Sequence, residues 1–209
     1  HWAEARPDHP VLVWDPADGD GRTWTYAELW TDVRRLAAGL SDRGIAKGDK
    51  VLIHSENSPE MVLAWLACAT LGAVAVTTNT KSVAVELEFF IDKAQCVAAI
   101  TQPEFADLVA EAGGALKWTS VIGQDFDDLF ADDAEAWTGR EVEPMLPFGI
   151  MFTSGTTNKP KAVVHTHANA IWASRTGPRN IDLGPDDRYL IYLPFFHVNA
   201  QSWSFFSVL

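Results

Sequence analysis

Two hydrophobic patterns alternate along this chain. Short, continuous apolar runs bounded by turn residues, such as 50–54 and 73–77, predict buried strands. Between these runs, apolar residues recur at helical spacing, as they do from Leu29 to Leu40, and predict amphipathic helices. We expect strands at 11–14, 23–25, 50–54, 73–77, 97–101, 120–122, 148–152 and 162–165, and helices between 25 and 44, between 58 and 72, at 83–93 and at 103–112.

The predicted helix ends carry residues that suit them. Thr25 with Glu28 three positions later matches a capping box, and Ser58 followed by Pro59 is typical of a helix start. Gly72 is expected where the second of these helices ends. Strands that alternate with helices indicate parallel βαβ units. The predicted fold class is therefore α/β, with layered βαβ sheets and flanking helices.

The composition is that of a folded chain with an acidic surface. Its 209 residues are 47% apolar and include 28 acidic and 16 basic side chains, for a formal net charge of -12. These values exclude a disordered chain, a collagen and a small disulfide-rich scaffold. Nucleic acid is not an expected partner, because its phosphates require clustered Lys and Arg. No apolar run has the length of a membrane span, and the sequence does not indicate an oligomeric state.

Several residues outside the main motif are assigned to the core or to the surface. Cys68 and Cys96 lie in apolar runs, so we expect reduced core thiols and, with no signal peptide in view, a cytoplasmic location. Trp172 and Trp203 are expected to pack in the core. The acid-rich segment 125–135 is expected to be a solvated surface.

The segment with the clearest chemistry joins the strands predicted at 148–152 and 162–165. Residues 153–161 contain four hydroxyl side chains, one Gly, two Lys and one Pro. Hydroxyls and free backbone N–H groups donate hydrogen bonds to phosphate oxygens, Lys supplies positive charge, and Gly155 permits close backbone approach. The segment is not a Walker A loop, because GxxxxGK[ST] is absent. From composition alone, a phosphate-binding loop and an ordinary polar hairpin loop both remain open.

This loop and the strand after it resemble the signature loop of the adenylate-forming superfamily, which includes acyl-CoA synthetases, luciferases and the adenylation domains of peptide synthetases. That pattern reads approximately T-S-G-T-T-G-x-P-K-G-V, and eight residues match it: Thr153, Ser154, Gly155, Thr156, Thr157, Pro160, Lys161 and Val163. Asn158 and Ala162 replace two glycines of the pattern. An Asn at the first of these positions resembles the sequences of the branch near carnitine-CoA ligase. Because Asn tolerates a positive φ, Asn158 is expected in a left-handed turn, and Ala162 in ordinary strand geometry.

A second resemblance lies in residues 192–201, which are similar to the P-x-x-H segment of acyl-CoA synthetases. It implies that His197 and Asn199 line the acid and pantetheine site, and that His197 and Lys161 are the catalytic residues. No residue from Phe195 to Gln201 is acidic, so the ammonium group of an amino-acid substrate lacks a counter-charge here. The nearby pair His165 and His167 lacks further ligands in sequence, so a resident metal site is not expected there.

The resemblance implies an ATP-dependent ligase that adenylates a small carboxylic acid, releases pyrophosphate and transfers the acyl group to a thiol, most simply coenzyme A or a carrier thiol. Mg²⁺ would accompany ATP and contact Thr156. The implied nucleotide cradle consists of Thr153, Ser154, Gly155, Thr156, Thr157, Asn158, Lys159 and Lys161.

Residues 25–29, 48–51 and 57–60 also resemble the N-terminal region of that superfamily. Residues 1–209 are therefore expected to be the N-terminal portion of the large adenylation domain, without the C-terminal lid domain and inactive alone. Two alternatives remain open. One is a diazotase-type relative that activates nitrite with ATP for diazotisation of an aromatic amine. The other is a catalytically inactive homologue that acts as a binding domain.

Overall fold

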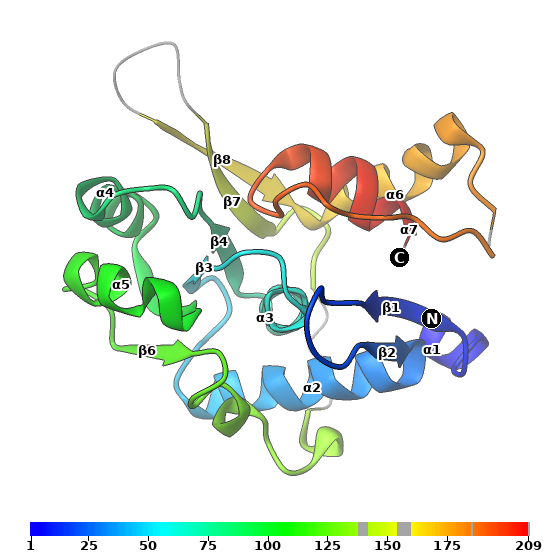
Figure 1. Ribbon diagram of the computed structural model, residues 1–209, viewed down its shortest axis with the longest axis horizontal. Helices are drawn as coiled ribbons and strands as arrows, with labels where there is room; N and C mark the ends of the chain where they lie inside the picture. The colour runs from blue at the N-terminus through cyan, green and yellow to red at the C-terminus, as the bar shows by residue number, and fades with distance from the viewer. Residues whose placement is uncertain (138–141, 154–159, 185, 209) are drawn as a thin grey trace.

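A six-stranded sheet organises the molecule (Figure 1). The computed structural model describes residues 1–137, 142–153, 160–184 and 186–208. The strand order is β6-β5-β3-β4-β7-β8, and neighbouring strands are parallel except for β8, which is antiparallel to β7. The strands are β3 (Lys50–His54), β4 (Val74–Thr77), β5 (Cys96–Thr101), β6 (Trp118–Val121), β7 (Pro147–Thr153) and β8 (Lys161–Thr166). A separate antiparallel pair consists of β1 (Pro10–Trp14) and β2 (Arg22–Thr25).

Helices cover both faces of this sheet. Helices α2 (Tyr26–Asp42) and α3 (Pro59–Leu71) lie on one face, and α4 (Ala84–Ala94) and α5 (Ala106–Ala112) on the other (Figure 1). Val51 and Ile53 of β3 join the first hydrophobic cluster, whereas Leu52 between them joins the second. Strands covered on both faces are apolar throughout, which explains the continuous apolar runs. The layered α/β class is confirmed.

The remaining elements follow the sheet or connect its strands. Helix α6 (His167–Ile181) follows β8, and the π-helical segment η4 (Asn199–Phe205) leads into α7 (Phe206–Val208). Four short elements complete the described chain: α1 (Trp2–Ala5), η1 (Pro103–Phe105), η2 (Asp127–Leu129) and η3 (Ala134–Ala136). Across the described ranges, no helix is both long enough and apolar enough to cross a bilayer.

Local capping interactions place the helix ends where the sequence predicts them. The Thr25 hydroxyl accepts a hydrogen bond from the Glu28 backbone N–H, and the Glu28 carboxylate accepts one from the Thr25 N–H. The Ser58 hydroxyl accepts a hydrogen bond from the Met61 N–H at the start of α3. Gly72 ends α3 with a φ of 76°, which favours glycine. These interactions are local, so a short sequence window contains them.

Three predictions about the chain outside the motifs are wrong in part. Phe126 and Leu129 in the acid-rich segment are buried in the core, because the acids alternate there with apolar side chains. Trp172 is not a core residue, since its side chain is 67% exposed on α6. The helix predicted at 103–112 begins as the 3₁₀ turn η1 before α5. The side chain of Trp203 lies outside the described part of the structure.

Both cysteines agree with their prediction. Cys68 and Cys96 are buried and unbridged. Burial raises the pKa of each thiol to about 12, because an apolar environment disfavours the thiolate. Neither thiol is therefore a nucleophile at neutral pH.

Candidate active site

Strands β7 and β8 bring together the two ends of the signature loop. Thr153 ends β7 and Lys161 begins β8, and these two exposed residues are Cα partners in the antiparallel pair. Ala162 pairs with Phe152 inside the strand and has no positive φ, as predicted. The other six cradle residues lie outside the described ranges: Ser154, Gly155, Thr156, Thr157, Asn158 and Lys159. The loop therefore follows the carboxyl end of β7.

Two neighbouring strands of the sheet send their loops to opposite faces at this same edge. The loop after β3 leads to α3 on one face, and the loop after β4 leads to α4 on the other. In open parallel sheets, ligands bind in the crevice where two such loops part. Because β7 is parallel to β4 and adjacent to it, Thr153 at the end of β7 lies at this same edge of the sheet.

His54, at the end of β3, is a buried polar residue that the sequence analysis missed. Its Nδ1 lies 2.8 Å from the Thr78 hydroxyl, and its carbonyl accepts a hydrogen bond from the Thr101 hydroxyl. Its ring packs edge-on against Phe105, and its Nε2 is buried with no hydrogen-bond partner among the described atoms. Burial lowers the pKa of His54 to about 4, so the ring is neutral at pH 7. A histidine that ends an otherwise apolar strand was the available signal.

His197 lies on an exposed turn before η4. Its backbone N–H donates to the Pro194 carbonyl at 3.0 Å, and its carbonyl accepts from the Gln201 N–H at 3.3 Å. Its ring centroid lies 4.5 Å from that of Phe196. Asn199, the first residue of η4, is also exposed. Both predicted acid-site side chains therefore have access to a ligand.

Gln201 joins this turn to the sheet edge. The side chain is buried, and its Nε2 donates to the Thr77 hydroxyl at 3.2 Å and to the Phe195 carbonyl. Thr77 ends β4 and is the register partner of Met151 in β7. The turn with His197 and the strand that leads to Thr153 are thus both attached to the carboxyl edge of the sheet at β4. In the sequence, Gln201 is distinguished only as the last residue of the segment 192–201.

These features coincide with one family. A protein family described as AMP-binding enzyme matches residues 1–209, the whole of the chain. The chain belongs to the AMP-binding enzyme family. The family match thereby confirms the resemblance that the signature loop indicated.

Several known proteins are similar over nearly the whole of this chain. The crotonobetaine/carnitine–CoA ligase of Salmonella paratyphi B is 31% identical over 211 residues, which cover 93% of this chain and 40% of that protein. The inhibitor-bound N-terminal domain of FACL13 from Mycobacterium tuberculosis has a TM-score of 0.88 at 31% identity, covering 99% of this chain and 52% of that one. The chain thus spans about 40% of the length of the ligase it matches.

A third relative has been solved with ligands. The o-succinylbenzoate CoA synthetase of Bacillus subtilis in complex with its acyl-adenylate intermediate has a TM-score of 0.85 at 31% identity, covering 99% of this chain and 40% of that one. The same enzyme in complex with ATP and a magnesium ion has a TM-score of 0.81 at 28% identity, covering 99% and 53%.

His165 and His167, at the end of the β7–β8 hairpin, are both partly buried. His165 lies in β8, and His167 begins α6 with its ring edge-on to Phe148. Partial burial lowers the pKa of both rings, which favours neutral imidazoles. Among the residues with described positions, no three His, Cys, Asp or Glu side chains gather in a way that could hold a metal ion.

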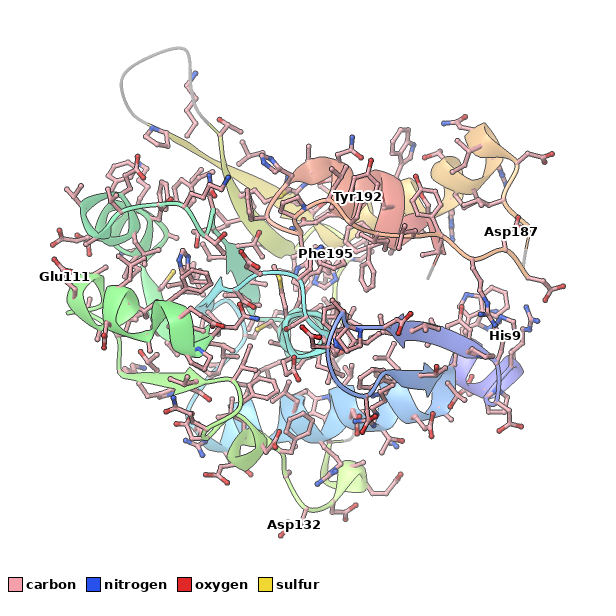
Figure 2. All side chains as sticks on the ribbon, in the orientation of Figure 1. His9, Glu111, Asp132, Asp187, Tyr192 and Phe195 are labelled. Carbon is pink, nitrogen blue, oxygen red and sulfur yellow. The ribbon has the colours of Figure 1, made fainter. Side chains whose placement is uncertain are left out.

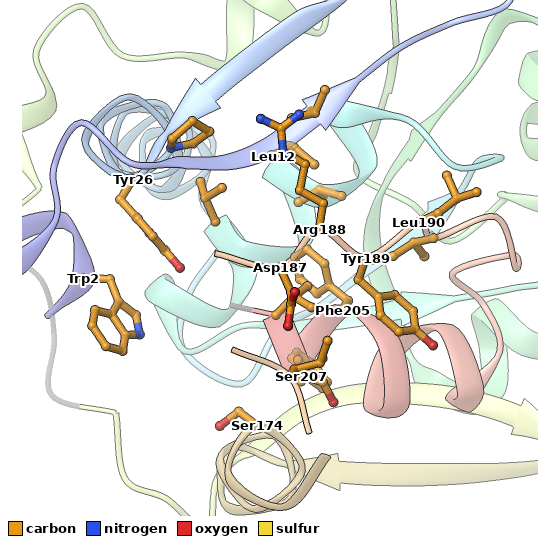
Figure 3. A pocket seen from close by; sticks show the side chains of 18 of the residues that line it. Trp2, Leu12, Tyr26, Ser174, Asp187, Arg188, Tyr189, Leu190, Phe205 and Ser207 are labelled. Carbon is orange, nitrogen blue, oxygen red and sulfur yellow. The ribbon is translucent and has the colours of Figure 1, made fainter. Parts of the chain in front are cut away.

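A pocket of about 950 Å³ opens elsewhere, between the N-terminal elements and α6. Figure 3 shows Trp2, Leu12 and Tyr26 on one side of it and Ser174 on another. Of the candidate residues that the structure describes, none lines this pocket: Thr153, Lys161, His197 and Asn199 all lie outside it. The four candidate side chains thus lie outside the pocket, although Asn57 and Phe195, close to the turn with His197, are among the residues that line it.

Proposed function

We propose that the protein containing this chain is an ATP-dependent acid:CoA ligase. The carboxylate of the acid attacks the α-phosphorus of ATP, an acyl-adenylate forms, and pyrophosphate leaves. A thiol, coenzyme A or a carrier thiol, then attacks the acyl carbon and AMP leaves. The observation that carries this proposal is the matched signature loop, whose two ends β7 and β8 hold together at the carboxyl edge of the sheet. In this proposal, residues 1–209 are the N-terminal portion of the large adenylation domain.

The loop residues would bind the phosphates of ATP. Ser154, Thr156, Thr157 and Lys161 are proposed to contact the β- and γ-phosphates, with Thr153 and Lys159 at the borders of the cradle. Gly155 and the backbone of Asn158 would shape it. Hydroxyl and ammonium donors suit phosphate oxygens, and donors placed in advance stabilise charge that develops during transfer. Lys161 contributes positive charge from a paired strand end, so its backbone is held in place.

The hydroxyl oxygens of the loop, though not its ammonium groups, suit a magnesium ion that accompanies ATP. Mg²⁺ prefers oxygen ligands and usually binds one or two protein groups together with substrate phosphates. The Thr156 hydroxyl is the proposed protein contact. The ion would neutralise phosphate charge and so make the leaving pyrophosphate more stable.

The turn that follows Pro194 would form the acid and thiol site. His197 and Asn199 are exposed and lie in the segment that Gln201 attaches to β4. Since residues 195–201 contain no acidic side chain, the proposed substrate is an acid without an α-ammonium group next to this segment. The two unbridged cysteines are consistent with a reducing, cytoplasmic location.

The test is ATP–pyrophosphate exchange by the full-length protein, with pooled carboxylic acids in one arm and nitrite in the other. Exchange that depends on a carboxylic acid, followed by CoA-dependent release of AMP, is the expected result. Exchange with nitrite alone would assign the protein to the diazotase-type relatives instead. Absence of exchange in both arms, with folded protein that fails to bind ATP, would favour the inactive homologue.

A further inference from the structure

One side-chain amide holds the segment that leads to His197. The Asn57 Nδ2 donates a hydrogen bond to the Leu193 carbonyl at 2.8 Å, and the Asn57 Oδ1 accepts one from the Phe195 N–H, also at 2.8 Å. A carboxamide is a donor and an acceptor at once, so it can pair with two backbone groups that lie two residues apart. Asn57 thus fixes both Leu193 and Phe195 through their backbone.

Phe195 is held from both sides of its backbone. Its N–H is bonded to Asn57 and its carbonyl to the buried Gln201 amide. Its ring is buried and packs against Trp65 and Phe205. Figure 2 shows Phe195 in the interior, below the C-terminal helical segment. Because His197 follows two residues later, in a turn closed by its N–H on Pro194, the place of Phe195 determines the place of His197.

Asn57 is itself anchored to the carboxyl edge of the sheet. It lies in the short loop after β3, where the adjacent Glu56 N–H donates to the Gln102 side chain at 2.9 Å. The helix cap of α3 is supplied by Ser58, so both bonds of the Asn57 amide go to residues 136 and 138 positions away in sequence. The Asn57 amide therefore bonds to the distant segment, whereas the loop after β3 is fixed by the bonds of Glu56 and Ser58.

We propose that Asn57 is a positioning residue of the acid site: through the Leu193 and Phe195 backbone it sets the position of the His197 side chain. This inference rests on the proposed function, which assigns His197 to that site. It predicts a selective effect, because the bonds of Asn57 reach the His197 segment, whereas Thr153 and Lys161 of the ATP cradle lie on β7 and β8. Displacement of a positioned group by about 1 Å can cost about 100-fold in rate.

The first measurement compares Asn57→Ala with wild type in the full-length protein. The catalytic efficiency for the acid is expected to fall about 10- to 100-fold, with the KM for ATP within about twofold of wild type. Asn180→Ala is the matched control, since Asn180 is exposed near the end of α6, and it should leave both parameters unchanged. An equal loss for acid and ATP would show a merely structural role and overturn the inference.

The isosteric variant Asn57→Asp gives a readout that lost folding would not imitate. An ionised carboxylate at this position would still accept from the Phe195 N–H but cannot donate to the Leu193 carbonyl, so the activity of the variant should be low at neutral pH. A protonated carboxyl group has both a donor and an acceptor. Relative to wild type at the same pH, the Asp variant should therefore recover several-fold as the pH is lowered from about 6 towards about 4, where a carboxyl group becomes protonated, and the Ala variant should not. Parallel profiles for both variants would contradict the proposed pairing.

Amide hydrogen exchange distinguishes a failure of the Asn57 inference from a failure of the proposed function. In Asn57→Ala the amide of Phe195 should exchange at least about tenfold faster than in wild type, and Asn180→Ala should show no change there. Unchanged exchange at Phe195 overturns the inference even if the enzyme is an acid:CoA ligase. If wild type is inactive towards every acid while Phe195 exchanges faster in the variant, the proposed function fails and the hold of Asn57 on the segment stands.

Discussion

The centre of the sheet and the hairpin at its edge contain similar β-branched residues in different surroundings. Val51 and Ile53 of β3 are fully buried, whereas Val163 and Val164 of β8 are 39% and 52% exposed. Strand β3 has a neighbour on each side and helices on both faces, while β8 pairs within the described sheet only with β7. Burial at the centre contributes stability. The edge strand β8, which contributes less, begins where the loop proposed to bind ATP ends.

The sharpest test of this division is a change in the loop that leaves the centre intact. The double variant Thr156→Val, Thr157→Val keeps the side-chain shape and removes two hydroxyl donors. Removing one well-placed donor costs about 100- to 1000-fold, so ATP–pyrophosphate exchange should fall by at least about 1000-fold. The unfolding temperature should remain that of wild type. Thr31→Val, at an exposed hydroxyl on α2, is the control. Exchange at the wild-type rate in the double variant would rule out the phosphate assignment.

The buried His54 at the end of β3 allows the stability of the centre of the sheet to be tested by a change in pH. The pKa of His54 is about 4 in the folded protein and 6.5 in the unfolded chain. Between these values the unfolded state binds more protons, so stability falls as pH decreases from 6.5 towards 4, by about 3 kcal/mol from this residue. Full stability from this group is present above pH 6.5.

Urea unfolding of wild type and His54→Leu over this pH range measures the effect. The variant loses the bond to Thr78, so it should be less stable at neutral pH. Its free energy of unfolding should nevertheless depend less on pH than that of wild type. Identical pH dependence in the two proteins would show that His54 is not the group responsible.

One substitution placed in both regions compares them directly. Val51→Thr puts a hydroxyl into a fully buried position and should cost about 2 kcal/mol in unfolding free energy. Val164→Thr is the same change on a half-exposed position, and it should cost less than about 0.5 kcal/mol. Chemical denaturation of the two variants gives both numbers. A similar cost at Val164 would show that the outer face of β8 is covered in the full-length protein.

A smaller effect on catalysis is expected at Lys161, the end of the loop where β8 begins. Lys161→Met removes one positive charge from an exposed position and should raise the KM for ATP about tenfold, because one of several phosphate contacts is lost. Stability should not change, since an exposed side chain contributes little. Lys93→Met, on an exposed position of α4, should leave the KM for ATP unchanged. A KM equal to that of wild type in Lys161→Met would remove Lys161 from the cradle.

Prediction from sequence succeeded where the determining interactions are local. The capping residues Thr25 and Ser58 act on N–H groups three positions away, and Gly72 ends its helix through its own φ. Helix α6 was not predicted, although Thr166 and Asn169 form a capping box at its start. It contains Pro178 and packs closely on α7, where a Cβ at Gly177 would lie 1.9 Å from the Ser207 hydroxyl. The hydrophobic periodicity of one segment cannot predict such a contact between two helices.

For the candidate site, the sequence by itself determined the candidate residues: a loop rich in hydroxyls and lysines between two apolar strands, and the histidine of a P-x-x-H pattern. The tertiary structure decided which other residues form hydrogen bonds near them. The sequence assigns no contacts to Asn57, Thr77 and Gln201, yet the parallel order of β3 and β4 brings Asn57 and Thr77 to one edge, where Gln201 bonds to Thr77. A hydrogen bond between residues 136 positions apart depends on where the chain returns, and the burial of both faces of the sheet sets that return.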